Sequence, residues 1–152
     1  MYSFRKSKKG FTLIELMVVV AIIGVLALLG LRLYTGQQQK AKNAIVKANA
    51  GTIQTLLQAN MADLSTDWAN ADAAVDTVDD ESGVHNPYDG GTGDGAVKGG
   101  GSVAGSGAVT APTDATPGCV YVFKDSSVDF KYYVQGVDQD GALVGDLMVA
   151  QK

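Results

Sequence analysis

The chain has 152 residues, 46% of them hydrophobic, and a formal net charge of −4. This length suffices for one modest domain. Fifteen of the sixteen acidic residues lie from Asp63 onward, so this part of the chain lacks the basic surface that nucleic acid binding requires. A single cysteine, Cys119, excludes an intramolecular disulfide, and we expect it to be a small buried residue beside a strand.

The chain begins with a basic leader, residues 1–10, which is followed by an uninterrupted apolar run over residues 11–31. A run of about 21 residues is long enough to cross a membrane as a helix. A secretory signal peptide would have a shorter apolar core and a small-residue cleavage site; cleavage near Gly30 remains the alternative. The dense leader charges favour a cytoplasmic N-terminus.

A second helical pattern follows the apolar run. Apolar residues recur there at steps of three or four, with polar residues on the opposite side. They are Val46, Ala50, Ile53, Leu57, Met61 and Leu64. The two segments together predict one long helix over residues 11–66, with a membrane anchor first and an amphipathic half after it.

The remainder, residues 67–152, is expected to form a small globular head. Residues 67–83 show only weak periodicity and are predicted to be irregular, with at most one helical turn. Residues 89–117 are so rich in glycine that we expect a long exposed loop without a regular element. Residues 119–150 contain three β-branched and aromatic segments, 119–123, 128–137 and 142–150, which predict three antiparallel strands. The fold class is therefore α+β.

Two details of the strands are predicted from residue types. Phe130, Tyr132 and Val134 alternate with Lys131, Tyr133 and Gln135, so the middle strand has one face to lay against a helix. Asp140 and Gly141 then predict the turn into the last strand.

The most informative motif is Lys8-Lys9-Gly10-Phe11-Thr12-Leu13-Ile14-Glu15, a basic leader that ends in glycine before an apolar run containing one acid. It resembles the N-terminus of a type IV prepilin. The resemblance implies that a membrane peptidase cuts after Gly10 and methylates the new N-terminal amine of Phe11. It also implies that Glu15 pairs with the cationic Phe11 N-terminus of a neighbouring subunit during assembly. The alternative is an acid at the headgroup level of an ordinary single-pass anchor.

The sequence departs from the family pattern at two positions. Arg32 stands where pilins commonly carry a proline, so Gly24 and Gly30, together with Gly36, are candidates for helix flexibility. Close helix packing is an equally plausible reason for these glycines. The lone Cys119 also excludes the disulfide-closed C-terminal loop of many pilins.

The resemblance implies a structural subunit of a type IV pilus, without enzymatic activity or cofactor. Its expected partners are further pilin subunits, the prepilin peptidase and methyltransferase, and the pilus assembly platform. Before assembly it is expected in the cytoplasmic membrane, and afterwards in the extracellular filament. Two alternatives are a pseudopilin of a type II secretion or DNA-uptake machine, and a membrane-anchored enzyme or receptor.

The sequence leaves adhesion and motility roles open. Asp138, Asp140 and Asp146 have a spacing that suits calcium, but solvated acids at a hairpin turn are the preferred interpretation.

Overall fold

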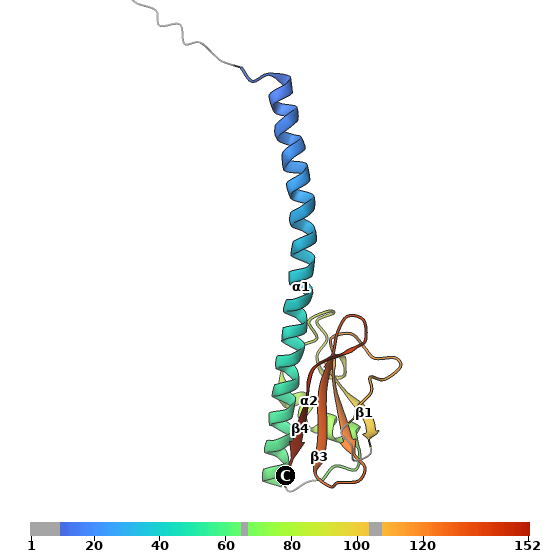
Figure 1. Cartoon of the computed structure of the whole chain (residues 1–152). Coiled ribbons are helices and arrows are strands. Elements are labelled where there is room, and N and C mark those ends of the chain that lie inside the picture. The colour runs from blue at the N-terminus through green and yellow to red at the C-terminus, as the bar shows by residue number, and fades with distance from the viewer. Residues whose placement is uncertain (1–9, 65–66, 104–107) are drawn as a thin grey trace, which may run out of the picture. The chain divides into compact units, whose positions relative to one another are not determined.

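The computed structural model describes residues 10–64, 67–103 and 108–152 (Figure 1). Two compact units make up the chain, Met1–Gln38 and Gln39–Lys152. The predicted leader up to residue 9, the predicted helix end at residues 65–66 and residues 104–107 of the predicted loop lie outside the described residues. An α+β architecture is present, as predicted, with two α-helices, a short 3-10 helix η1 (Gly93–Gly95) and four strands among the described residues.

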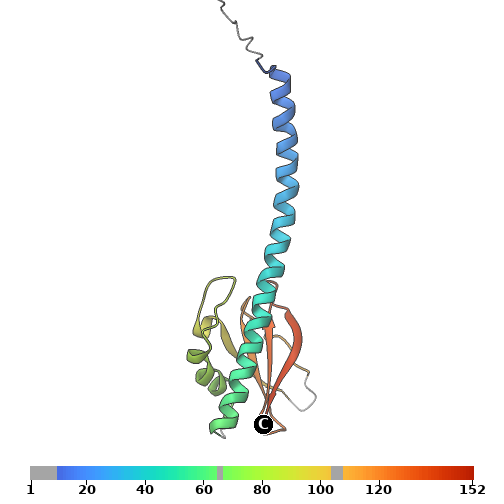
Figure 2. The ribbon, with the colours of Figure 1, turned by 90° about the vertical axis from the view of Figure 1, so that its left-hand side faces the viewer.

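The first helix, α1, spans Leu13–Leu64. No proline occurs in this stretch of sequence, so no residue after the first turn lacks the N–H that the helix requires. In the second unit, α1 lies across one face of the sheet (Figure 2). The predicted apolar face is confirmed at five positions, which are at most 2% exposed: Val46, Ala50, Ile53, Leu57 and Met61. Burying a side chain such as Ile53 or Leu57 stabilises the fold by roughly 1.5–3 kcal/mol.

A second helix, α2, spans Ala71–Ser82, where we predicted an irregular segment. That prediction is wrong because both helix ends are capped and one face is buried. The Asn70 side chain accepts a hydrogen bond from the Ala73 N–H at 2.9 Å, and Gly83 ends the helix in the left-handed region at φ 58°. The buried face consists of Ala71, Ala74, Val75 and Val78.

The sheet has four strands, one more than predicted, in the order β1-β2-β3-β4. They are β1 (Val97–Val103), β2 (Val120–Asp125), β3 (Lys131–Val137) and β4 (Leu143–Gln151). The last three pair antiparallel, and they overlap the three predicted segments. The turn between β3 and β4 also lies where predicted, with Gly141 at φ 80°. Strand β1 pairs parallel with β2.

Strand β1 contradicts the prediction that residues 89–117 contain no regular element. Two of its glycines are explained by close approach of neighbouring side chains. A Cβ on Gly99 would lie 1.8 Å from the Asp72 carboxylate, and one on Gly100 would lie 2.3 Å from the Phe123 ring. Residues without a side chain are therefore needed here, whereas in the sequence the same glycines indicate a loop.

Apolar residues bury both faces of the sheet. On the α1 face, Tyr132 and Val134 pack with α1 and α2, as the alternation in the middle strand predicts. On the other face, Tyr121, Phe123 and Tyr133 form a second cluster. Val109 and Ala115, from the connection between β1 and β2, pack against that cluster. Tyr133 is consequently only 2% exposed.

Asp67, which follows α1, is hydrogen-bonded to the sheet. Its carboxylate accepts hydrogen bonds from the Lys124 ammonium at 3.1 Å, from the Tyr132 hydroxyl at 2.9 Å and from the Phe130 N–H at 3.2 Å. Burial raises the pKa of Asp67, but the hydrogen bonds from Lys124 and Tyr132 outweigh it and hold the pKa below its ordinary value. Burial and the neighbouring Asp67 raise the pKa of Tyr132. This network links the chain before α2 to β2 and β3.

Candidate functional site

The candidate site lies where the chain enters α1. Gly10, Phe11 and Thr12 precede the helix, and α1 begins at Leu13. Gly10 is exposed, and the Phe11 side chain is 91% exposed. The peptide bond between Gly10 and Phe11 therefore lies outside regular secondary structure and next to exposed side chains.

Thr12 and Glu15 bond reciprocally at the start of the helix. The Glu15 carboxylate oxygen Oε2 accepts the Thr12 N–H and the Thr12 hydroxyl, each at 2.9 Å. In return, the Glu15 N–H donates to Thr12 Oγ1 at 3.3 Å. This arrangement is a capping box, which satisfies backbone donors that have no partner within the helix.

The role of Thr12 was missed in the sequence, although its signal is present. A threonine followed three residues later by glutamate, just before an apolar run, is typical of a capping box. Glu15 was interpreted only as an acid in an apolar helix, so its hydrogen bonds with Thr12 were not predicted. Besides the assembly role that was predicted for it, Glu15 therefore caps its own helix.

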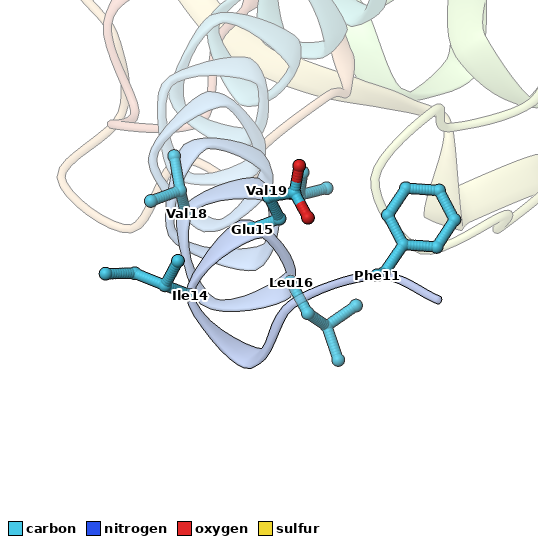
Figure 3. Close-up of a pocket in the computed structure, with 6 residues that line it drawn as sticks. All are labelled: Phe11, Ile14, Glu15, Leu16, Val18 and Val19. Carbon is cyan, nitrogen blue, oxygen red and sulfur yellow. The ribbon is translucent and has the colours of Figure 1, made fainter. Parts of the chain in front are cut away.

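Apolar side chains surround the capping box. Figure 3 shows Ile14 and Val18 on one side of the first turns, and Phe11 and the Glu15 carboxylate on the other. Together with Leu16 and Val19, these residues line an open hollow. Large apolar side chains remain at least half exposed along the helix from Leu13 to Tyr34. By length and composition, α1 is able to cross a membrane.

Gly24 and Gly30 lie inside α1, as does Gly36. A Cβ at any of the three would meet no atom within 4 Å in the single chain. Arg32, in place of the proline common in pilins, also lies within the helix. No contact among the described residues explains these glycines, and their role in flexibility or helix packing remains a prediction.

The acids considered for calcium do not converge on a site. Asp138 Oδ1 accepts the N–H groups of Asp140 and Ala142, both at 2.9 Å, which fixes the turn between β3 and β4. Asp146 is exposed on β4. Over residues 10–64, 67–103 and 108–152, no group of three or more His, Cys, Asp or Glu side chains is arranged to hold a metal ion.

Cys119 is buried, as predicted, and lies just before β2. Its thiol donates to the Gly95 carbonyl at 3.2 Å, and it accepts from the Asn86 amide at 3.7 Å. Burial raises the pKa of this thiol, so the reactive thiolate form is disfavoured. Cys119 therefore serves packing within the second unit.

Comparison with known proteins adds an independent finding. Residues 5–31 match the family model described as the prokaryotic N-terminal methylation motif. The chain is 46% identical over 55 residues to the fimbrial protein EcpB of Eikenella corrodens, covering 36% of this chain and 35% of the relative. It is 38% identical over 69 residues to the type IV major pilin protein PilA of Myxococcus xanthus, covering 44% and 31%.

A further relative is the type IV major fimbrial protein FimA of Dichelobacter nodosus, 39% identical over 56 residues, covering 37% of this chain and 36% of the relative. Each match thus covers about a third of the relative's own length. No solved structure matches the chain. The matched motif and the three relatives together confirm the resemblance to the type IV pilin family that the leader and the apolar helix predicted.

Proposed function

We propose that this chain is the precursor of a pilin, the structural subunit of a type IV pilus filament. The arrangement at the start of α1 carries the proposal. An exposed Gly10 precedes an exposed apolar helix whose first turn holds Glu15, the one acid in residues 1–62. The relatives carry the names of major pilin and fimbrial proteins, which favours the filament over the pseudopilin alternative.

Processing takes place between Gly10 and Phe11. A prepilin peptidase removes residues 1–10, and the new amine of Phe11 is methylated. The exposure of both residues outside the helix supports this step, because a peptidase needs an extended, accessible bond. The apolar helix then holds the subunit in the cytoplasmic membrane until the assembly platform transfers it into the filament.

Assembly uses the charge of Glu15. Its Oε2 atom accepts both Thr12 hydrogen bonds, and within the described residues Oε1 accepts none. The capping box thus stabilises the carboxylate in the lone subunit while leaving one oxygen for the Phe11 amine of a neighbour. Because both groups are charged, the new hydrogen bond is stronger than a neutral one.

Intact-mass analysis of the purified subunit tests processing. The expected mass corresponds to residues 11–152 with one methyl group on Phe11. A mature subunit that retains residues 1–10, or that begins near residue 31, would contradict the proposal and favour the signal-peptide alternative.

Three substitutions separate the charge of Glu15 from its capping role. Glu15→Gln keeps a side chain that can bond to the Thr12 N–H, so the cap is retained while the charge is lost. Glu15→Val removes both, and Thr12→Ala weakens the cap at a cost of about 1 kcal/mol while keeping the charge.

We expect Glu15→Gln and Glu15→Val subunits to be processed and to accumulate in the membrane without forming fibres. Thr12→Ala subunits should still form fibres. Immunoblots of membrane and sheared fractions measure both pools. Abundant fibres from Glu15→Gln subunits alone would show that apolar packing suffices and that the charge is not required.

A further inference from the structure

Two exposed surfaces of opposite charge occur in the second unit. The first, which we call the acidic face, consists of Asp72, Asp76 and Asp80, spaced one turn apart on α2. The second, the basic strip, consists of Lys40 and Lys47, spaced two turns apart on α1. All five side chains belong to exposed residues.

Neither surface takes part in an ion pair in the part of the chain that the structure describes. In the described ranges the ion pairs are Lys124 with Asp67 and Lys131 with Asp125, so both surfaces remain without one. Like charges one turn apart on a helix repel each other. The last turn of α2 contains no basic residue, and acids near a helix C-terminus are disfavoured by the helix dipole. A cationic partner from outside would therefore stabilise α2.

The two surfaces lie at opposite edges of the sheet. α2 packs against β1, with the Asp72 carboxylate directly over Gly99. The Lys47 stem lies over Gly145 of β4, 3.2 Å from the position that a Cβ would take. Two turns further along the same side of α1, Gln54 donates to the Val149 carbonyl of β4 at 2.8 Å. β1 and β4 are the two edge strands, and Figure 2 shows α2 and the red β4 on opposite sides.

Because of this separation, one copy cannot pair its own surfaces, but two copies can. Lys40 and Lys47 lie about 10.5 Å apart along their helix, and Asp72 and Asp80 lie about 12 Å apart along theirs. Each surface has a residue of opposite sign at its margin: Lys98 lies beside Asp72 and Asp76, and Asp146 follows Gly145. The dominant charges are nevertheless complementary in sign and spacing.

We propose that the basic strip of one copy binds the acidic face of the next copy in the filament. This inference rests on the proposed filament function, since it assigns the surfaces by which neighbouring heads meet. The contact joins two different surfaces, so each bound copy leaves one of each sign free. Such a head-to-tail contact extends an open polymer, whereas a contact between identical surfaces would stop at a dimer.

Charge reversal in the full-length chain tests the contact. Lys40→Glu with Lys47→Glu reverses the basic strip, and Asp76→Lys with Asp80→Lys reverses the acidic face. Each pair of changes replaces attraction by repulsion, and we expect the yield of sheared fibres to fall roughly tenfold while the membrane pool remains normal. All four changes in one chain restore complementarity and should restore fibres.

Asp114→Lys with Asp129→Lys is the matched control for the acidic face, because it changes the net charge by the same amount and sign at exposed acids outside α2. Fibres should persist in this variant. Undiminished fibres in either reversed variant, no recovery in the fourfold variant, or an equal loss in the control would each overturn the inference.

Crosslinking locates the contact directly. A carbodiimide joins a lysine amine to a carboxylate that touches it, and fibres mixed from ¹⁴N and ¹⁵N subunits distinguish links between copies. We expect mixed-label peptides joining Lys40 or Lys47 to acids of α2. Links from these lysines to other carboxylates would overturn the inference and leave the filament function standing.

If the wild-type chain forms no fibres, the proposed function fails instead. The same crosslinking on the detergent-solubilised full chain at low salt then tests the contact alone. Links between the basic strip and the acidic face would support it, and their absence would overturn it.

Discussion

Gly136 offers a quantitative test of how α1 is seated on the sheet. A Cβ at this position would lie 2.2 Å from Val46 Cγ1, yet 3.5 Å from Val46 Cβ. Val46 is fully buried, so it has no room to move away. Gly136→Ala should therefore overpack the core and lower the free energy of unfolding by about 2 kcal/mol.

A second substitution should relieve the clash. Val46→Ala alone removes two buried methyl groups and should cost about 2 kcal/mol. In the double variant, the new methyl group of Ala at 136 meets the remaining Cβ at 46 at the ordinary distance of 3.5 Å. The double variant should then lose about 2 kcal/mol rather than about 4, a coupling of about 2 kcal/mol.

Urea unfolding of the full chain in detergent micelles provides the measurement. Trp68, the one tryptophan, is 6% exposed and lies edge-on to Tyr132 at 5.4 Å, so its fluorescence reports on the core. Val144→Ala is the control substitution. The Cγ2 atom of Val144 lies at an unstrained 3.5 Å from the Cβ position at residue 136, so the loss of stability from Val144→Ala should add to that from Gly136→Ala. Additive losses for the Val46 pair, within about 0.5 kcal/mol, would refute the packing described.

Three further predictions use the same unfolding assay. Asn70→Ala removes the cap on the Ala73 N–H and should cost about 1 kcal/mol, whereas Asn70→Asp should retain most of it. Because the pKa of Asp67 is lowered in the fold, its charged form stabilises the fold fully at a pH above its ordinary pKa of 3.8, and this stabilisation should disappear as the pH falls through the lowered pKa. Asp67→Asn should lack this loss of stability in acid. A dependence of the unfolding free energy on acid pH equal to that of the wild type would contradict the prediction. Gly51→Ala, at a helical position with no atom within 4 Å, should stabilise the fold by up to about 1 kcal/mol, and a loss would show an unrecognised contact.

The parts of the fold that the sequence predicted are those with a strong local period. The face of α1 from Val46 to Met61 and the three C-terminal strands follow from apolar spacing and residue type alone. α2 was missed although Asn70 and Gly83 mark its ends, because the four acids between Asp72 and Asp80 concealed the spacing of its small apolar residues. Local signals were present there, and they were given too little weight.

Strand β1 could not be predicted in the same way. Gly99 and Gly100 have no local preference for a strand, and they are needed only because Asp72 and Phe123 come close in the folded chain. At the candidate site, Gly10, Phe11 and Glu15 are predictions from the motif, whereas the capping role of Thr12 follows from its hydrogen bonds. Strand β1 is thus determined by tertiary contacts, and the role of Thr12 by helix capping.

The parallel pairing of β1 with β2 predicts an order of folding. β2, β3 and β4 are joined by connections of five residues each, 126–130 and 138–142, so their hairpins form locally. β1 joins only after the sixteen residues 104–119 have closed a much longer loop, which costs more chain entropy. We therefore expect the three-stranded meander of β2, β3 and β4 to form first, and β1 to be the last strand to gain protection from hydrogen exchange. Until β1 has paired, the β2 edge is open to pairing with strands of other chains.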